Sequence, residues 1–140
     1  MSVKTVAILS PGDMGHAVGR ALVDHGLIVI TSLEGRSERT RRLASEGNIQ
    51  DVPDLKEMAS RADIILSILV PSEAIGVART VADAIRDMAS APPFVDCNAV
   101  SPQTAQVMSE IIGEAGGSFI DGSIIGGPPG RGASPRIYVS

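Results

Sequence analysis

Short runs of apolar, β-branched residues alternate along this chain with longer amphipathic stretches. The apolar runs predict strands at Thr5–Leu9, Leu27–Thr31, Ile64–Leu69, Phe94–Asp96, Ser118–Asp121 and Ile137–Val139, with a weaker one around Asn48–Asp51. The amphipathic stretches predict helices near Met14–His25, Ser37–Ser45, Asp54–Ser60, Ser72–Met88 and Pro102–Ala115. This alternation is typical of an α/β fold, with a doubly wound, mostly parallel sheet and right-handed crossovers.

Length and composition restrict the function classes. The chain has 140 residues, which suits a single domain over 1–140, and its 44% hydrophobic and 20% charged residues predict a folded globular protein. A net charge of −4 and 2% aromatic residues argue against a nucleic-acid partner. The single cysteine, Cys97, fits a reducing compartment. The apolar runs are too short for a membrane span or a signal peptide, so we expect a cytoplasmic protein without a membrane partner.

The first predicted strand runs directly into a glycine-bearing turn and a helix. The segment Ser10-Pro11-Gly12-Asp13-Met14-Gly15 has the spacing of the dinucleotide fingerprint G-x-G-x-x-G, with Ser10 in place of the first glycine. Unpaired N–H groups and the positive end of the helix dipole would meet a pyrophosphate there. Gly12 would allow close approach, Gly15 would let the helix lie close to the strand, and Pro11 supplies no N–H. The alternative is a turn whose glycines serve packing alone.

The end of the second predicted strand carries charges that discriminate between the two nicotinamide cofactors. Glu34 could accept hydrogen bonds from the ribose hydroxyls, whereas Arg36 could pair with a 2′-phosphate. Ser37 begins the next predicted helix and could hold a phosphate on its free amides. We favour NADP over NAD, because a planar guanidinium pairs bidentately with phosphate. The alternative is a solvated, arginine-rich helix face with Ser37 as a plain cap.

The predicted strand Ile64–Leu69 leads into Val70 and Pro71, at the carboxyl edge where open α/β sheets bind ligands. Pro71 would stop the strand, and Ser72 would cap the following helix. A strand end and a cap explain these residues fully. Any cofactor contact of Leu69, Val70 and Pro71 would involve mostly backbone and apolar atoms.

Five motifs follow one another along almost the whole chain. They are the glycine turn 10–15, Gly35-Arg36-Ser37, Val70-Pro71, the segment from Asp96 through Asn98 to Thr104, and Asp121–Gly127. In this order and content the chain resembles the N-terminal NAD(P)-binding domain of the β-hydroxyacid dehydrogenase and 6-phosphogluconate dehydrogenase superfamily, imine reductases included. The glycine turn departs from the family pattern at Ser10, where the family has glycine.

The resemblance implies an oxidoreductase that transfers hydride between a nicotinamide cofactor and a small hydroxyacid, keto or imine substrate. By resemblance, Val70-Pro71 lines the nicotinamide, Asn98 lies beside its ribose, and Ser123, Gly126 and Gly127 belong to the substrate-binding segment. Ile125 takes the family's serine position, which favours a less polar substrate or an imine over a typical 3-hydroxyacid. Gly126-Gly127 could also be a loop required only by backbone geometry.

The sequence assigns no catalytic residue. By resemblance, the general acid/base is a lysine in a second, all-helical domain, whereas Lys4 and Lys56 match no family motif. His16 and His25 are on the first predicted helix, where a histidine is more often packed or exposed than a proton shuttle. The residues show no metal-ligand spacing, so no metal is expected. We expect the C-terminal helical domain to be absent from these 140 residues, and a homodimer through that domain in the full-length form.

Two other functions are compatible with the glycine turn. One is a non-catalytic dinucleotide-binding or sensing module, complete at this length. The other is a Rossmann-type methyltransferase, against which Arg36-Ser37 and the segment from Asn98 to Thr104 argue. The favoured interpretation remains the cofactor-binding domain of an oxidoreductase. We expect this chain alone to bind cofactor weakly and to turn over no substrate.

Overall fold

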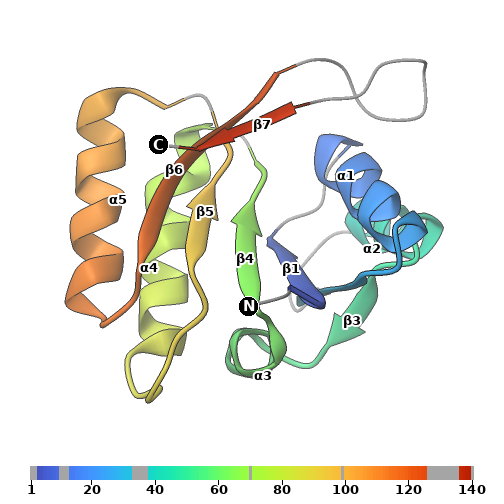
Figure 1. Cartoon of the computed structure of the whole chain (residues 1–140), viewed down its shortest axis with the longest axis horizontal. Helices are drawn as coiled ribbons and strands as arrows, with labels where there is room; N and C mark the ends of the chain where they lie inside the picture. Colours follow the sequence, from blue (N-terminus) through green and yellow to red (C-terminus); the bar gives the residue numbers. More distant parts are fainter. Residues whose placement is uncertain are drawn as a thin grey trace.

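The computed structural model describes residues 3–9, 13–32, 38–69, 71–98, 100–125 and 136–139. The described strands form one seven-stranded sheet in the order β3-β2-β1-β4-β5-β6-β7 (Figure 1). Neighbouring strands are parallel except for β6 and β7, which pair antiparallel. The bounds are β1 Thr5–Leu9, β2 Ile28–Ser32, β3 Gln50–Val52, β4 Ile64–Ser67, β5 Phe94–Asp96, β6 Phe119–Ile125 and β7 Arg136–Val139.

Helices cover both faces of this sheet, as the alternating pattern predicts. α1 and α2 pack on one face, and α3, α4 and α5 pack on the other, where a short 3-10 turn precedes α4. Within the described ranges, no helix is both long and apolar enough to cross a bilayer. The bounds are α1 Asp13–Asp24, α2 Glu38–Glu46, α3 Leu55–Arg61, the 3-10 turn η1 Pro71–Glu73, α4 Ala74–Ile85 and α5 Pro102–Glu114.

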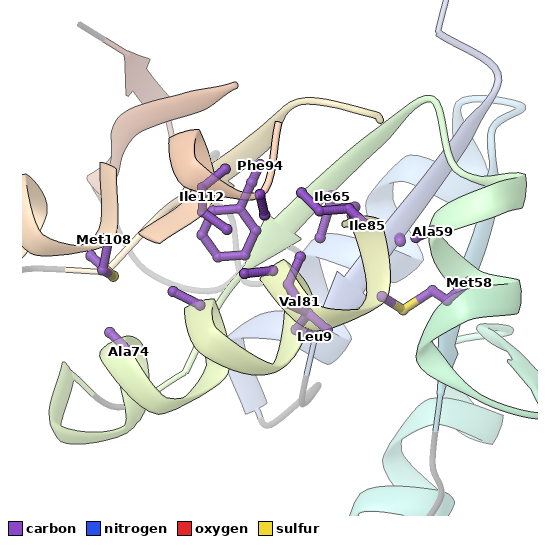
Figure 2. Close-up of a cluster of buried hydrophobic side chains, with 14 of the residues drawn as sticks. Leu9, Met58, Ala59, Ile65, Ala74, Val81, Ile85, Phe94, Met108 and Ile112 are labelled. Atoms are coloured by element: carbon purple, nitrogen blue, oxygen red, sulfur yellow. The ribbon is translucent and has the colours of Figure 1, made fainter. Parts of the chain in front are cut away.

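The central strand β1 is apolar on both faces because each face meets a layer of helices. Val6 and Ile8 belong to the core cluster under α1 and α2, whereas Ala7 and Leu9 belong to the cluster under α3, α4 and α5. Figure 2 shows this second cluster, in which Phe94 of β5 lies near α4 and α5. Burial on both faces accounts for the continuous apolar runs in the sequence.

The strand order reverses at β1. From β1 the chain goes through α1 to β2 and then through α2 to β3, on one side of β1. It then crosses back through α3 to β4 on the other side of β1. The two sets of crossovers therefore diverge at the carboxyl ends of β1 and β4, which is the topological switch point of a doubly wound sheet.

Three helices end in the same hydrogen-bonded turn. A residue with positive φ follows α1, α2 and α5, namely Gly26 at 88°, Asn48 at 59° and Gly116 at 87°. In each turn, the next N–H donates to the carbonyl five residues back, for Leu27 to Leu22, Ile49 to Ala44 and Gly117 to Ile112. This turn satisfies the last helical carbonyls and directs the chain toward the following strand.

The structure corrects the predicted elements on either side of Pro71. β4 ends at Ser67 rather than Leu69, because the Leu69 N–H donates to the Asn98 side chain. The helix expected over Ser72–Met88 is shorter, since η1 precedes α4 and α4 ends at Ile85. Ser72 is not its cap: Glu73 takes that position and makes no side-chain capping hydrogen bond.

Several other predicted elements shift by one or two residues, and β6 continues to Ile125, four residues beyond its predicted end at Asp121. The weak strand expected at Asn48–Asp51 lies at Gln50–Val52, because the turn at Asn48 that ends α2 comes first. α2 is described from Glu38, so its predicted start at Ser37 lies outside the described residues. The same is true of the loop predicted at Gly126–Gly132.

Two glycines near the end of α5 test the role of the left-handed turn. A Cβ on either Gly113 or Gly116 would meet no atom within 4 Å, and only Gly116 has a positive φ. We expect Gly116→Ala to lower the free energy of unfolding by about 1 kcal/mol. We expect Gly113→Ala, inside the helix, to raise it by about 0.5–1 kcal/mol. Urea denaturation of both variants measures the difference, and changes of the same sign would contradict this account.

Candidate functional site

The start of α1 lies at the switch point. β1 ends at Leu9 and α1 begins at Asp13, so only three residues separate the strand from the helix. Gly15 is buried in the first turn. One turn later, a Cβ on Gly19 would lie 2.6 Å from Ile49 Cδ1 and 3.3 Å from Ile8 Cδ1. Glycine at this position therefore keeps the helix face small enough to pack on Ile8 and Ile49.

Most of the predicted site residues lie at or beyond the edges of the described ranges. Outside them are Ser10, Pro11, Gly12, Arg36, Ser37, Val70, Gly126 and Gly127. The structure gives only secondary structure for Asp13 and Met14 at the start of α1, Pro71 in η1 and Ser123 in β6. It describes Gly15, Leu69 and Asn98 in full. The functional roles of all these residues, described or not, stay predictions.

A row of polar residues crosses the carboxyl edge of the sheet. Ser67 on β4 is aligned with Asp96 on β5, and Asp96 is aligned with Asp121 on β6. We call Ser67, Asp96 and Asp121 the polar row. Ser67 and Asp96 are completely buried. Aligned residues of a sheet project to the same face, so these side chains lie together on the α4 and α5 side.

Asn98 joins the polar row to the end of β4. Its Oδ1 accepts a hydrogen bond from the Leu69 N–H at 2.8 Å. Its Nδ2 donates to Asp96 Oδ1 at 2.6 Å and to Ser67 Oγ at 3.3 Å. With 6% of its surface exposed, Asn98 uses both amide hydrogens inside the protein. The structure thus places Asn98 beside Leu69 at the predicted edge, held by residues of the sheet.

The family follows from the comparison of the whole chain with known proteins. Residues 5–140 match the model of the NAD binding domain of 6-phosphogluconate dehydrogenase. The chain belongs to this family. The predicted resemblance to the 6-phosphogluconate dehydrogenase superfamily is confirmed, and the chain is an NAD(P)-binding domain of that family.

Three similar proteins illustrate the relationship. A conserved protein of unknown function, whose structure is described as similar to 3-hydroxyacid dehydrogenases, is 28% identical with a TM-score of 0.80; the match covers 95% of this chain and 48% of that one. Mycobacterium tuberculosis 3-hydroxyisobutyrate dehydrogenase, solved with L-serine, is 20% identical with a TM-score of 0.77; the match covers 97% of this chain and 46% of that one. An uncharacterized 28.5 kDa protein of Methanothermus fervidus is 32% identical over 98 residues, which are 70% of this chain and 36% of that protein. The chain spans half or less of each relative.

Burial dominates the electrostatics of the polar row in this NAD(P)-binding domain. It raises the pKa of Asp96 to about 6, with a further increase from Asp121 and an opposing effect of the Asn98 hydrogen bond. Asp96 Oδ2 is buried and has no hydrogen-bond partner. Burial, with the nearby Asp96 charge, also raises the pKa of the Cys97 thiol to about 11. Cys97 is therefore a neutral thiol at pH 7 and is unsuited to nucleophilic chemistry.

The two lysines lie on other parts of the fold than α1. The amides of Lys4 and Thr5 both donate to the Asp63 carboxylate at 2.9 Å, at the amino ends of β1 and β4, and this lowers the pKa of Asp63. Lys4 is thus at the opposite edge of the sheet from Asn98. Lys56 is exposed on α3. Among the described residues, no three His, Cys, Asp or Glu side chains come together as a metal site.

The two histidines near α1 differ from each other. His16 is on the helix, and its Nε2 is buried without a hydrogen-bond partner. His25 lies one residue beyond the end of α1 rather than within the helix, and it is exposed. Its Nδ1 lies 2.7 Å from the Ala21 carbonyl oxygen. Neither histidine is part of the polar row.

The polar row is a feature that the motifs and strand patterns of the sequence do not predict. Asp96 and Asp121 belong to separate motifs, and Ser67 lies inside an apolar run. A signal was nevertheless present, because each of these three strands changes from apolar residues to a polar one. In a parallel sheet such positions gather at one edge.

The burial of Asp96 predicts an unusual pH dependence of stability. Its folded pKa of about 6 is above the ordinary value of 3.8, so the folded state holds this proton more tightly than the unfolded chain does. The protein therefore loses stability from this group as the pH rises from about 4 to 6. The Asp96→Asn variant lacks this titrating group. We therefore expect its free energy of unfolding, relative to that of the parent, to be higher at pH 7 than at pH 4 by roughly 2–3 kcal/mol. Urea unfolding at both pH values measures this gain, and a difference independent of pH would contradict it.

Proposed function

We propose that this chain binds NADP(H) at the carboxyl edge of its sheet, as the cofactor-binding domain of an oxidoreductase. The observation that carries the proposal is the position of α1, which begins at the switch point beside β4. The free amides of this helix and its dipole suit a pyrophosphate. The close packing of α1 at Gly19 fits this use, because it keeps the helix start near the strand ends.

The two halves of the dinucleotide would lie on opposite sides of β1. The pyrophosphate that joins the two halves would be held by the glycine turn, which consists of Ser10, Pro11, Gly12, Asp13, Met14 and Gly15. The adenosine half would lie toward the end of β2, where residues 33–37 connect Ser32 to Glu38. The nicotinamide half would lie toward Leu69, Val70, Pro71 and Asn98. A bound nicotinamide supplies or accepts the hydride, and the protein orients it and excludes water.

Arg36 and Ser37 favour NADP over NAD in this proposal. They lie in the connection from β2 to α2, where a guanidinium would pair with a 2′-phosphate. Solved structures with the same fold include an imine reductase of Myxococcus stipitatus in complex with NADP+ and a variant in complex with NAD+. Both cofactors are thus compatible with this architecture, and the discrimination depends on side chains such as Arg36.

For the substrate we propose a small hydroxyacid, keto or imine compound. Its contacts would come from Ser123, Gly126 and Gly127. β6 ends at Ile125 and is parallel to β5, so the chain leaves the sheet there at the same edge that carries Asn98. Ile125 in the family's serine position favours a less polar substrate or an imine.

A non-catalytic nucleotide-binding role is supported by one observation. Lys4 is at the amino edge and Lys56 is exposed on α3, so neither is placed beside the nicotinamide half. Assays of NADPH oxidation with a panel of small keto acids and cyclic imines test this role. Reduction of any of them by this chain would exclude it, and would also contradict our expectation that this chain alone turns over no substrate.

Calorimetric titration of the parent and Arg36→Ala with NADPH and NADH tests the cofactor preference. We expect the substitution to weaken NADPH binding by about 1–3 kcal/mol and to leave NADH binding nearly unchanged. Arg79→Ala is the matched control, because Arg79 is an exposed guanidinium on α4, on the other face of the sheet. An equal loss of affinity for NADPH and NADH would contradict the proposed pairing of Arg36 with the 2′-phosphate.

A further inference from the structure

We infer that Asn98 is a positioning residue for the nicotinamide half of the cofactor, and that it acts through the backbone of Leu69 with its own amide oriented by Asp96. The inference rests on the proposed function and adds a mechanism to it. Asn98 makes three hydrogen bonds in this network: it accepts one from the Leu69 N–H, and it donates to Asp96 and to Ser67.

The contact with Leu69 replaces a bond of the β-ladder. β4 pairs with β1 and β5 only as far as Ser67, where the ladder ends. Two residues later, the Leu69 N–H is bonded to the Asn98 Oδ1 at 2.8 Å instead of to another strand. A single side chain, 29 residues away in the sequence, therefore holds the backbone that leads into Val70 and Pro71.

Asp96 determines which way the Asn98 amide faces. A carboxylate only accepts hydrogen bonds, so the oxygen of Asp96 at 2.6 Å requires the NH₂ group of Asn98 on that side. Turned by 180°, the amide would set its oxygen against the carboxylate and its NH₂ group against the Leu69 N–H. Both contacts would be repulsive in a buried site where water does not compete.

The network holds one half of the proposed cofactor site and leaves the other half alone. Leu69 and Asn98 follow β4 and β5, on one side of β1, whereas the proposed adenosine half lies beyond β2 on the other side. Loss of the Asn98 amide should therefore weaken contacts to nicotinamide and its ribose alone. A general loss of folding would instead weaken binding of both halves.

The experiment compares NADPH with 2′-phospho-ADP, which lacks both the nicotinamide and its ribose. For Asn98→Ala we expect the Kd for NADPH to rise about tenfold and the Kd for 2′-phospho-ADP to change less than twofold. We also expect faster hydrogen exchange of the Leu69 amide, measured by NMR. Asn98→Ser fills more of the site and serves the same comparison if the alanine variant does not fold.

A side-chain swap and a control test the orientation of the amide. Asn98→Asp alone sets two carboxylates against each other, and we expect it to impair NADPH binding. Adding Asp96→Asn restores a donor at 96 and an acceptor at 98, and we expect the double variant to recover most of the affinity. The control is Ser101→Ala, which removes the N-cap bond from the Thr104 N–H at 3.1 Å and leaves Leu69 untouched. We expect it to change the Kd ratio of the two ligands less than twofold.

Three results would overturn this inference. They are an equal loss of affinity for NADPH and for 2′-phospho-ADP in Asn98→Ala, an unchanged affinity for both, and no recovery of NADPH affinity in the double variant. Binding of neither ligand by the parent chain would instead overturn the proposed function, and the positioning role with it. The two failures are thus distinguished by the parent chain alone.

Discussion

The parallel pairing of β1 with β4 in the middle of the sheet is the constraint on which the rest of the structure depends. It aligns Ile8 with Leu66 and Leu9 with Ser67, so both strands deliver their carboxyl ends to the same edge. The crossovers on either side of this pair diverge, because α1 leads to β2 and α3 returns to β4. The start of α1 is consequently left facing the strand ends instead of being covered by the next connection.

Burial on both faces explains why this pairing is stable and why polar groups are concentrated at one edge. The strands themselves are apolar where two helical layers cover them. Ser67 and Asp96 come at the last ladder positions of β4 and β5, where the backbone partners end and a side chain must replace them. Asn98 supplies that replacement for Leu69. The same residues that terminate the sheet thereby shape the proposed cofactor site.

The sequence predicted the features that depend on local pattern. The bounds of β1 and β5 agree with the structure, because apolar β-branched runs end there at a breaker or a polar residue. The predicted end of β4 was wrong, because the apolar run continues through Leu69 although the β-ladder stops at Ser67. The cause is the distant Asn98 side chain, which no local pattern encodes. The cofactor role of Asn98 is a prediction from family resemblance, whereas its contacts with Asp96 and Ser67 are visible only in the fold.

The proposed function requires the dinucleotide to lie across the switch point, with its pyrophosphate on the first amides of α1. A crystal structure of the chain soaked with NADPH tests this position. We expect density for the pyrophosphate at residues 12–15 and for the nicotinamide beside Leu69 and Asn98. Nucleotide bound at another surface, or a helix start blocked by the protein's own side chains, would contradict it.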